Sequence, residues 1–192
     1  MKQQEILRSL KNLNANKDST TWNPRTRQLA PHKPFLLLSI LDGIHIGWIN
    51  RPKITLSQDL IETFFRYWTQ IMGEDRNTTI ALPFFHMKSE AFWELQYNDG
   101  AEPYTNSPSL GGLLKRVAYA KIDDQLFQMM SEKEGRQIIT GAILNTYFSR
   151  DIREQITSIH QINIGAYQYA HQLELMATEP FEKYHADNDT SY

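Results

Sequence analysis

The sequence of 192 residues contains no cysteine. This absence excludes a disulfide scaffold, a zinc site built on thiolates and a cysteine nucleophile, and it fits a reducing cytosol. An excess of positive charge is also missing, because 20 Lys and Arg stand against 22 Asp and Glu, which gives a net charge of −2. General nucleic-acid binders are usually basic. The chain therefore does not have the overall charge of such a protein.

Long hydrophobic runs are absent as well. The longest mainly apolar stretch, residues 35–41, is far too short to span a bilayer. The first ten residues carry Glu5 and Arg8 inside their apolar pattern, which excludes a signal peptide. We therefore expect a soluble, cytoplasmic protein without a membrane partner.

Aromatic residues are plentiful, and they indicate a folded domain. Apolar residues make up 41% of the chain, with four Trp, nine Tyr and nine Phe. The length suits one sizeable core, so we expect a single domain over residues 1–178 and a tail or linker over residues 179–192. Within it, residues 1–28 are expected to form a basic N-terminal helix and loop.

Charge is unevenly distributed along the chain. Residues 1–34 contain seven Lys and Arg against Glu5 and Asp18, so this segment carries +5 and the remainder must carry −7. Such an asymmetry can mark an end that faces a polyanion, although an exposed basic end without a partner is the commoner explanation.

Apolar periodicity predicts a mainly α-helical α+β fold with a small antiparallel sheet. Ser57 is expected to cap the third helix, and Gly43 or Gly47 to end the second. Helices are expected over residues 4–13, 34–44, 58–72, 113–119, 123–130, 132–148 and 151–176. Strands are expected over residues 79–87 and 91–97, with a hairpin within residues 46–54.

Two segments about fifty residues apart have an unusual composition. Residues 25–34 form a basic, proline-bounded segment that leads into the apolar run, and residues 81–89 place two aromatic rings beside a proline, a histidine and a lysine. Charged groups and imidazoles next to bulky apolar rings do not suit plain core packing. A surface that must contact an anion and a soft or apolar group together would need this mixture.

The segment 99–112 is a predicted loop rich in Gly, Pro, Ser, Asn and Thr. Loops of this length are often functional. Ser107 and Ser109 could hydrogen-bond base edges in a DNA groove. The alternative is a tolerated surface insertion, and the sequence does not separate the two.

No catalytic, metal or cofactor motif is visible. There is no phosphate-cradling glycine loop and no nucleophile elbow, and the six histidines never occur four residues apart. We interpret Glu90 as a strand-edge or turn carboxylate, His160 as a helix-surface or satisfied core imidazole, and Trp22 as a loop residue that docks on the domain or, less commonly, stacks on a base. We therefore expect no catalysis, no metal and no cofactor.

Several of these motifs together resemble a known family. The segment Pro31-His32-Lys33-Pro34 followed by leucines, the Leu82-Pro83-Phe84-Phe85-His86 segment and Phe92-Trp93 occur in order. Over roughly residues 28–150 the chain resembles the DNA sulfur-binding domain found at the N-terminus of bacterial type IV, HNH-type restriction endonucleases. The resemblance implies binding of phosphorothioated double-stranded DNA. The HNH nuclease motif is absent, so a fused or separate nuclease is the implied partner.

The resemblance also implies roles for individual residues. Pro83 matches a proline wall against the sulfur and Leu82, where the family can have tyrosine, precedes it; His32 and Lys33 match a basic pair. His86 stands near a cavity position where the family has a small residue. With the neighbouring basic, aromatic and loop residues, the candidate DNA- and sulfur-binding residues are Arg25, Arg27, His32, Lys33, Leu82, Pro83, Phe85, His86, Lys88, Ser107 and Ser109.

Elementary chemistry agrees with such a site. Sulfur is larger, softer and more weakly hydrated than oxygen, so it loses less on entering an apolar pocket. Its phosphate remains charged and still needs cations or N–H donors nearby.

Three alternatives to phosphorothioate recognition remain open. A domain that recognises a modified base would need a deep aromatic pocket for the flipped ring. A protein-interaction module would show no DNA affinity. A cryptic nuclease is the weakest alternative, because no metal constellation is visible.

Overall fold

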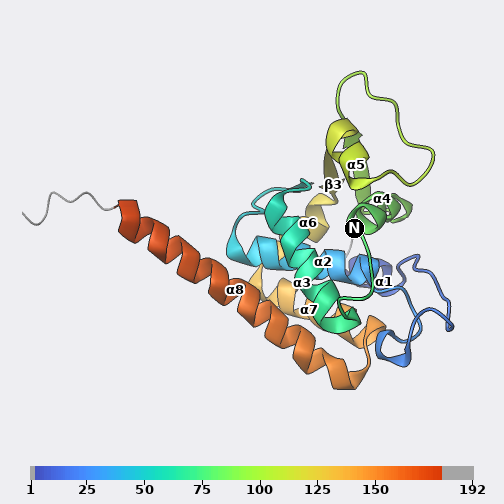
Figure 1. Cartoon of the computed structure of the whole chain (residues 1–192), viewed down its shortest axis with the longest axis horizontal. Helices are drawn as coiled ribbons and strands as arrows, with labels where there is room; N and C mark the ends of the chain where they lie inside the picture. The colour runs from blue at the N-terminus through green and yellow to red at the C-terminus, as the bar shows by residue number, and fades with distance from the viewer. Residues whose placement is uncertain (1–2, 179–192) are drawn as a thin grey trace, which may run out of the picture.

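The computed structural model describes residues 3–178, and it confirms a mainly helical α+β fold with a small three-stranded antiparallel sheet (Figure 1). The elements in chain order are α1 (Gln3–Lys11), the 3₁₀ turn η1 (Pro24–Thr26), α2 (His32–Ile46), β1 (Lys53–Ile54), α3 (Gln58–Met72), α4 (Ala81–His86), the 3₁₀ turn η2 (Met87–Ser89), β2 (Trp93–Tyr97), α5 (Leu110–Arg116), β3 (Val117–Ile122), α6 (Asp124–Ser131), α7 (Lys133–Tyr147) and α8 (Arg150–Thr178).

The centre of the core is α2. Twelve of its fifteen residues, from Lys33 to Ile44, are buried, because the sequence is apolar around most of the helix rather than along one stripe. It packs against α3, α4, α6, α7 and α8. The helix ends at Gly47, whose φ of 103° is the left-handed conformation that glycine adopts without strain. Gly47 was one of the two ends that the sequence predicted.

The N-terminal segment is held by α7, which lies far from it in sequence. Helix α1 packs against α7, and the Tyr147 hydroxyl both accepts the Leu13 N–H and donates to the Leu10 carbonyl, each at 2.9 Å. Residues more than 130 positions apart therefore close the core on this side.

The sheet has the order β1–β3–β2, so its central strand is the last in sequence. Lys53 stands opposite Lys121, and Trp93 stands opposite Ile122. The predicted hairpin within residues 46–54 is wrong: only Lys53 and Ile54 are extended, and they pair with β3 instead of with a neighbouring strand.

The predicted strand at residues 79–87 is also wrong, because this segment forms α4 and η2. A short, continuous apolar run cannot by itself separate a buried helix from a buried strand. Pro83 lies at the third position of α4, where its missing N–H costs no intrahelical hydrogen bond. The next strand is confirmed, since β2 occupies residues 93–97 of the predicted 91–97.

The predicted helix at residues 113–119 divides into two elements. Helix α5 ends at Arg116, and Val117 begins the central strand β3. Ala120 and Ile122 are fully buried there. Residues 117–122 are therefore extended because they pair with β1 on one side and β2 on the other, and these distant partners cannot be recognised from the local periodicity.

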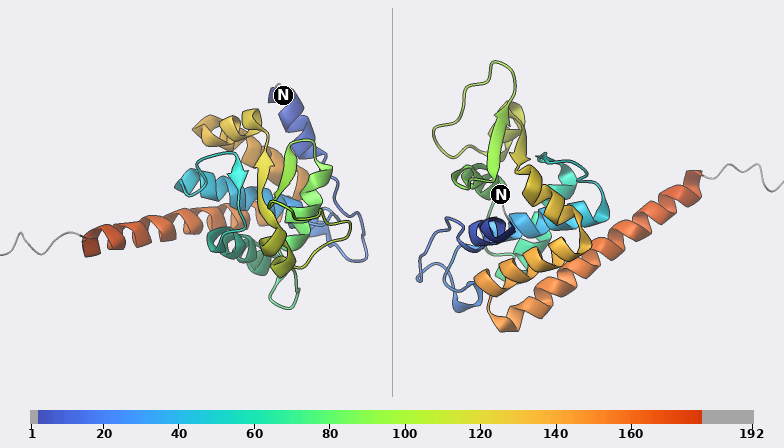
Figure 2. Two further views of the ribbon diagram at one scale, coloured as in Figure 1. Left: turned by 90° about the horizontal axis from the view of Figure 1, so that it is seen from above. Right: turned by 180° about the vertical axis from the view of Figure 1, so that it is seen from behind.

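The last two helices are confirmed, with α7 and α8 close to their predicted limits. The first part of α8 packs on α2 and α3, while its later part extends away from the body of the molecule (Figures 1 and 2). Among residues 3–178, no helix combines the length and the apolar composition needed to cross a bilayer. The predicted tail at residues 179–192 lies outside the described residues.

Candidate functional site

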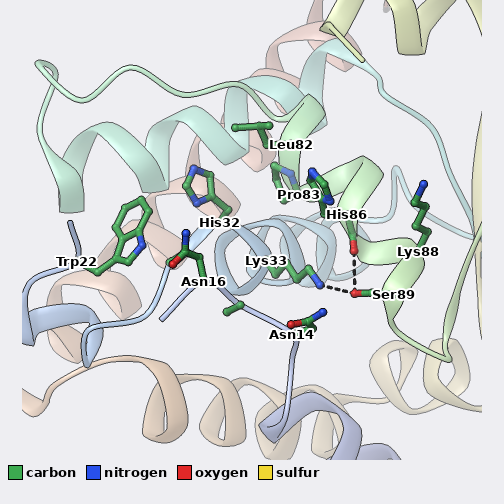
Figure 3. Close-up of a pocket in the computed structure, with 12 residues that line it drawn as sticks. Asn14, Asn16, Trp22, His32, Lys33, Leu82, Pro83, His86, Lys88 and Ser89 are labelled. Carbon is green, nitrogen blue, oxygen red and sulfur yellow. Dashed lines mark hydrogen bonds between the residues drawn. The ribbon is translucent and has the colours of Figure 1, made fainter. Parts of the chain in front are cut away.

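A cavity of about 690 Å³ opens where the N-terminal loop, the start of α2 and the α4–η2 segment meet (Figure 3). It brings together the two unusual segments that the sequence places about fifty residues apart. Its lining residues are Asn14, Ala15, Asn16, Trp22, Ala30, His32, Lys33, Leu82, Pro83, His86, Lys88 and Ser89.

Six of the eleven candidate residues line this cavity: His32, Lys33, Leu82, Pro83, His86 and Lys88. Ser107 lies next to them, with its hydroxyl oxygen 2.6 Å from His86 Nε2. The structure thus collects, around one hollow, most of the residues that the sequence analysis singled out.

The remaining four candidates have other contacts. Phe85 is buried behind the cavity, with the Lys88 ammonium 3.7 Å above its ring. The Ser109 hydroxyl caps α5 by accepting the Gly112 N–H. Arg25 lies 3.9 Å from Asp151, and Arg27 donates to the Phe148 carbonyl. The two arginines therefore contact the junction between α7 and α8 and do not line the cavity.

The N-terminal end of α2 faces the cavity through His32 and Lys33. The first N–H groups of a helix have no intrahelical acceptor, and the helix dipole makes this end positive. The N-cap residue is Pro31, which provides no side-chain acceptor, and the first turn contains no acidic residue. This end therefore has the properties of an anion-binding position.

Lys33 is not a free cation. Its ammonium lies 2.5 Å from Glu90 Oε1 and 2.8 Å from Ser89 Oγ, and the Lys33 and Glu90 side chains are only 7% and 8% exposed. Glu90 also accepts the Asn14 N–H. Glu90 lies in the bend between η2 and β2, which confirms the turn position expected for it, and its carboxylate is the buried counter-ion of Lys33, a pairing that the sequence did not predict. Burial of either charge alone would be costly.

The two histidines of the cavity are held in their neutral form. Burial lowers the pKa of His32 to about 4, and its ring packs against Trp68 and Trp22, at centroid distances of 4.5 and 5.4 Å. Burial, together with the charges of Lys33 and Lys88, lowers the pKa of His86. At neutral pH both imidazoles are polar hydrogen-bonding groups instead of charges.

The opposite wall is apolar. Pro83 is buried in it, while Leu82 is 37% exposed and forms part of the opening. Lys88 is the lining cation whose side chain is exposed to solvent. A mostly apolar wall beside a positive helix end and one solvated ammonium suits an anion that is weakly hydrated.

The other six lining residues were not among the candidates from the sequence: Asn14, Ala15, Asn16, Trp22, Ala30 and Ser89. Trp22 docks on the domain with 9% of its surface exposed, which confirms the commoner of its two interpretations. Its indole Nε1 is buried and has no hydrogen-bond partner within residues 3–178. The one feature of the sequence that could have indicated these lining residues is the pair of amides, Asn14 and Asn16, in a loop that precedes a basic segment.

Comparisons with known proteins give no family for this chain. No protein-family model matches it, and a search of curated proteins finds no relative. Within residues 3–178, no group of three or more His, Asp or Glu side chains is arranged to hold a metal ion.

Proposed function

We propose that the chain is a cytoplasmic recognition domain for duplex DNA that carries a phosphorothioate in its backbone. The observation that supports this proposal is the cavity itself, in which Leu82 and Pro83 stand opposite the positive end of α2. The sulfur would lie against the Leu82–Pro83 wall. The remaining phosphate charge would face the first N–H groups of α2 and the Lys88 ammonium.

The cavity offers little compensation to an ordinary phosphate. Its two imidazoles are neutral and the Lys33 charge is balanced by Glu90, so an oxygen anion would lose water without full replacement of its hydrogen bonds. Sulfur requires less compensation. An imperfectly satisfied polar atom costs roughly 1–3 kcal/mol, which corresponds to a preference of about 5- to 150-fold for the modified duplex.

The proposed role is that of the specificity half of a modification-dependent restriction system. DNA cleavage would come from an HNH nuclease, fused to this domain or supplied by a partner, with this domain providing no catalysis of its own. Purified protein that nicked phosphorothioated plasmid DNA in the presence of a divalent metal, and stopped on addition of EDTA, would contradict this division of labour.

The test is a binding titration with one duplex in three forms: unmodified, and phosphorothioated in each of the two stereoisomers at phosphorus. We expect at least one stereoisomer to bind about tenfold or more tightly than the unmodified duplex at moderate salt. Equal affinity for all three would overturn the proposal.

Pro83→Ala should reduce the ratio of modified to unmodified affinity toward one, because it removes the ring against which the sulfur packs. The matched control is Pro103→Ala, an exposed proline in the loop between β2 and α5 that does not line the cavity. Far-UV circular dichroism of both variants would verify that they fold. A Pro83→Ala ratio equal to that of Pro103→Ala would assign Pro83 a purely structural role.

A second candidate is recognition of a modified base, and one observation favours it. The cavity, at about 690 Å³, is larger than a single sulfur atom requires, and the rings of Trp22 and His32 form part of its wall. A flipped base could stack there. Methylated duplexes with 2-aminopurine beside the target would show a fluorescence increase on flipping. Phosphorothioate binding without that increase would exclude this candidate.

A further inference from the structure

A second cavity, of about 520 Å³, lies at the other end of α2. It is formed by three helices: α2 contributes His45, α7 contributes Lys133, Arg136, Gln137 and Thr140, and α8 contributes His160. No residue of the first cavity takes part. A helix of fifteen residues is about 22 Å long, so the two cavities are separate sites.

Two cations, Lys133 and Arg136, line the second cavity. Lys133 is the first residue of α7 and is exposed. Arg136 donates from Nη1 to the Met130 and Ser131 carbonyls, at 3.1 and 2.5 Å, which holds the guanidinium at the end of α6 without neutralising its charge. Glu132 and Glu134 are neighbours in sequence but do not line the cavity.

A buried polar network orients His160 toward this cavity. The Asp42 carboxylate is buried and accepts from Tyr67 Oη at 2.8 Å, and from Asn163 Nδ2 and His160 Nδ1 at 2.5 Å each. Because the carboxylate must accept, Nδ1 carries the proton, and Nε2 is on the ring edge turned away from Asp42. Asn163 is in turn held by Arg66. Such a network fixes one ring orientation, as the support of a binding site requires.

The pKa of His45 is affected by the positive charges around the cavity. Its ring lies 5.5 Å from that of His160. Burial lowers the pKa of His45, and the charges of Arg136, His160 and Lys133 lower it further, against an opposing effect of Asp42. Two imidazoles, an ammonium and a guanidinium thus line one hollow, and the Asp42 carboxylate that holds His160 already accepts from three donors.

We propose that this second cavity binds a phosphate group, carried either by a small phosphorylated molecule or by a nucleic-acid backbone. A tetrahedral dianion accepts several charge-assisted hydrogen bonds at once, and Lys133 and Arg136 of α7 can supply them. Gln137 and Thr140 add neutral donors. The site goes beyond the proposed recognition of modified DNA, because it shares no residue with that cavity.

The experiment is an NMR titration of the whole chain, in which the ring Cε1–H signals of the six histidines are followed. The probes, added in separate arms, are inorganic phosphate, adenosine monophosphate and an unmodified duplex. We expect His45 and His160 to shift in a saturable manner in at least one arm, while His171, exposed on α8, does not move. The arm that shifts them identifies the source of the phosphate. Shifts confined to His32 and His86, or no shift in any arm, would overturn the proposal.

Lys133→Glu tests the assignment of the site. A carboxylate in the first turn of a helix is favoured by the helix dipole, so this charge reversal leaves α7 folded. We expect the affinity for the effective probe to fall about tenfold or more. The matched control is Lys115→Glu on α5, which does not line the cavity. Equal affinities of the two variants would contradict the proposal.

Discussion

The two ends of α2 each place a buried charge beside a cavity, and they stabilise it in different ways. Lys33 lies in the first turn, where the helix dipole disfavours a cation, and it depends on a single carboxylate, Glu90, with Ser89 as a neutral acceptor. Asp42 lies one turn before the other end and is shared among three donors. The Lys33 charge therefore depends on one ionic partner, whereas the Asp42 charge is stabilised by three separate hydrogen bonds.

This difference accounts for the contrast between the cavities. At the N-terminal end the charges cancel inside the wall, which leaves a largely apolar hollow with neutral imidazoles. At the C-terminal end the carboxylate is withdrawn into the core, and the cations face the hollow. The same helix thus supports one site suited to a weakly hydrated anion and one suited to a strongly hydrated anion.

The largest loss of stability is expected for Glu90→Gln, because it leaves the Lys33 ammonium buried without its counter-ion. We expect the free energy of unfolding, measured by urea denaturation, to fall by about 3–5 kcal/mol. Lys33→Met in the same background should recover much of this loss, because the uncompensated charge is removed. The control is Glu94→Gln, an exposed carboxylate on β2, which should change stability by less than about 0.5 kcal/mol. Equal losses at positions 90 and 94 would contradict the pairing.

Acid should destabilise the N-terminal end through His32. Its pKa is lowered from 6.5 to about 4 in the folded protein, so between these values the unfolded chain binds a proton that the folded chain does not. The free energy of unfolding should therefore fall by about 3 kcal/mol as the pH drops through this window. His32→Gln should lack this contribution, while His45 and His86 remain in both proteins. Parallel pH profiles for the wild type and the variant would show that His32 titrates normally.

Asp42→Asn should have a smaller effect than Glu90→Gln, because the amide keeps one acceptor oxygen for the surrounding donors. We expect a loss of about 1–3 kcal/mol in thermal or urea unfolding, from the donors left unpaired. Asp99→Asn, an exposed carboxylate in the loop between β2 and α5, is the matched control. If Asp42→Asn lowered the free energy of unfolding more than Glu90→Gln does, the conclusion that the Asp42 end tolerates the loss of one charge better would be wrong.

The smallest effect is expected for Ser107→Ala, which removes the hydroxyl next to His86 Nε2. Both side chains are exposed, so stability should change by less than about 0.5 kcal/mol, while affinity for phosphorothioated duplex falls by no more than about tenfold. Ser109→Ala should behave in the opposite way, because it removes the N-cap of α5 at a cost of about 1 kcal/mol and leaves the cavity intact. Identical behaviour of the two variants would remove Ser107 from the site.

The parts of the fold that could be predicted from the sequence depend on local signals. The stripe of α3 and its Ser57 cap, and the periodicity of α7 and α8, need no distant partner. The conformation of residues 79–87 and the strand β3 could not be predicted, because the first is an apolar run without a period and the second depends on two flanking strands.

The same distinction holds for the site. Composition and resemblance selected half of the residues that line the cavity, including Pro83 and His86, because these residues stand in two short segments. The partnership of Lys33 with Glu90 spans 57 residues, and that of Glu90 with Asn14 spans 76. No local pattern carries such pairings, so the sequence predicts Lys33 as a DNA-binding cation without indicating its buried partner.

The closure of the N-terminal segment by Tyr147 has a consequence for synthesis on the ribosome. The bond between Leu13 and Tyr147 joins residues 134 positions apart, and translation proceeds at roughly 5–20 residues per second. On the order of ten seconds therefore pass between the synthesis of Leu13 and the synthesis of Tyr147. During that interval the apolar helix α2 is present without α7 and α8, so the nascent chain completes its core only when nearly all of the domain has been made.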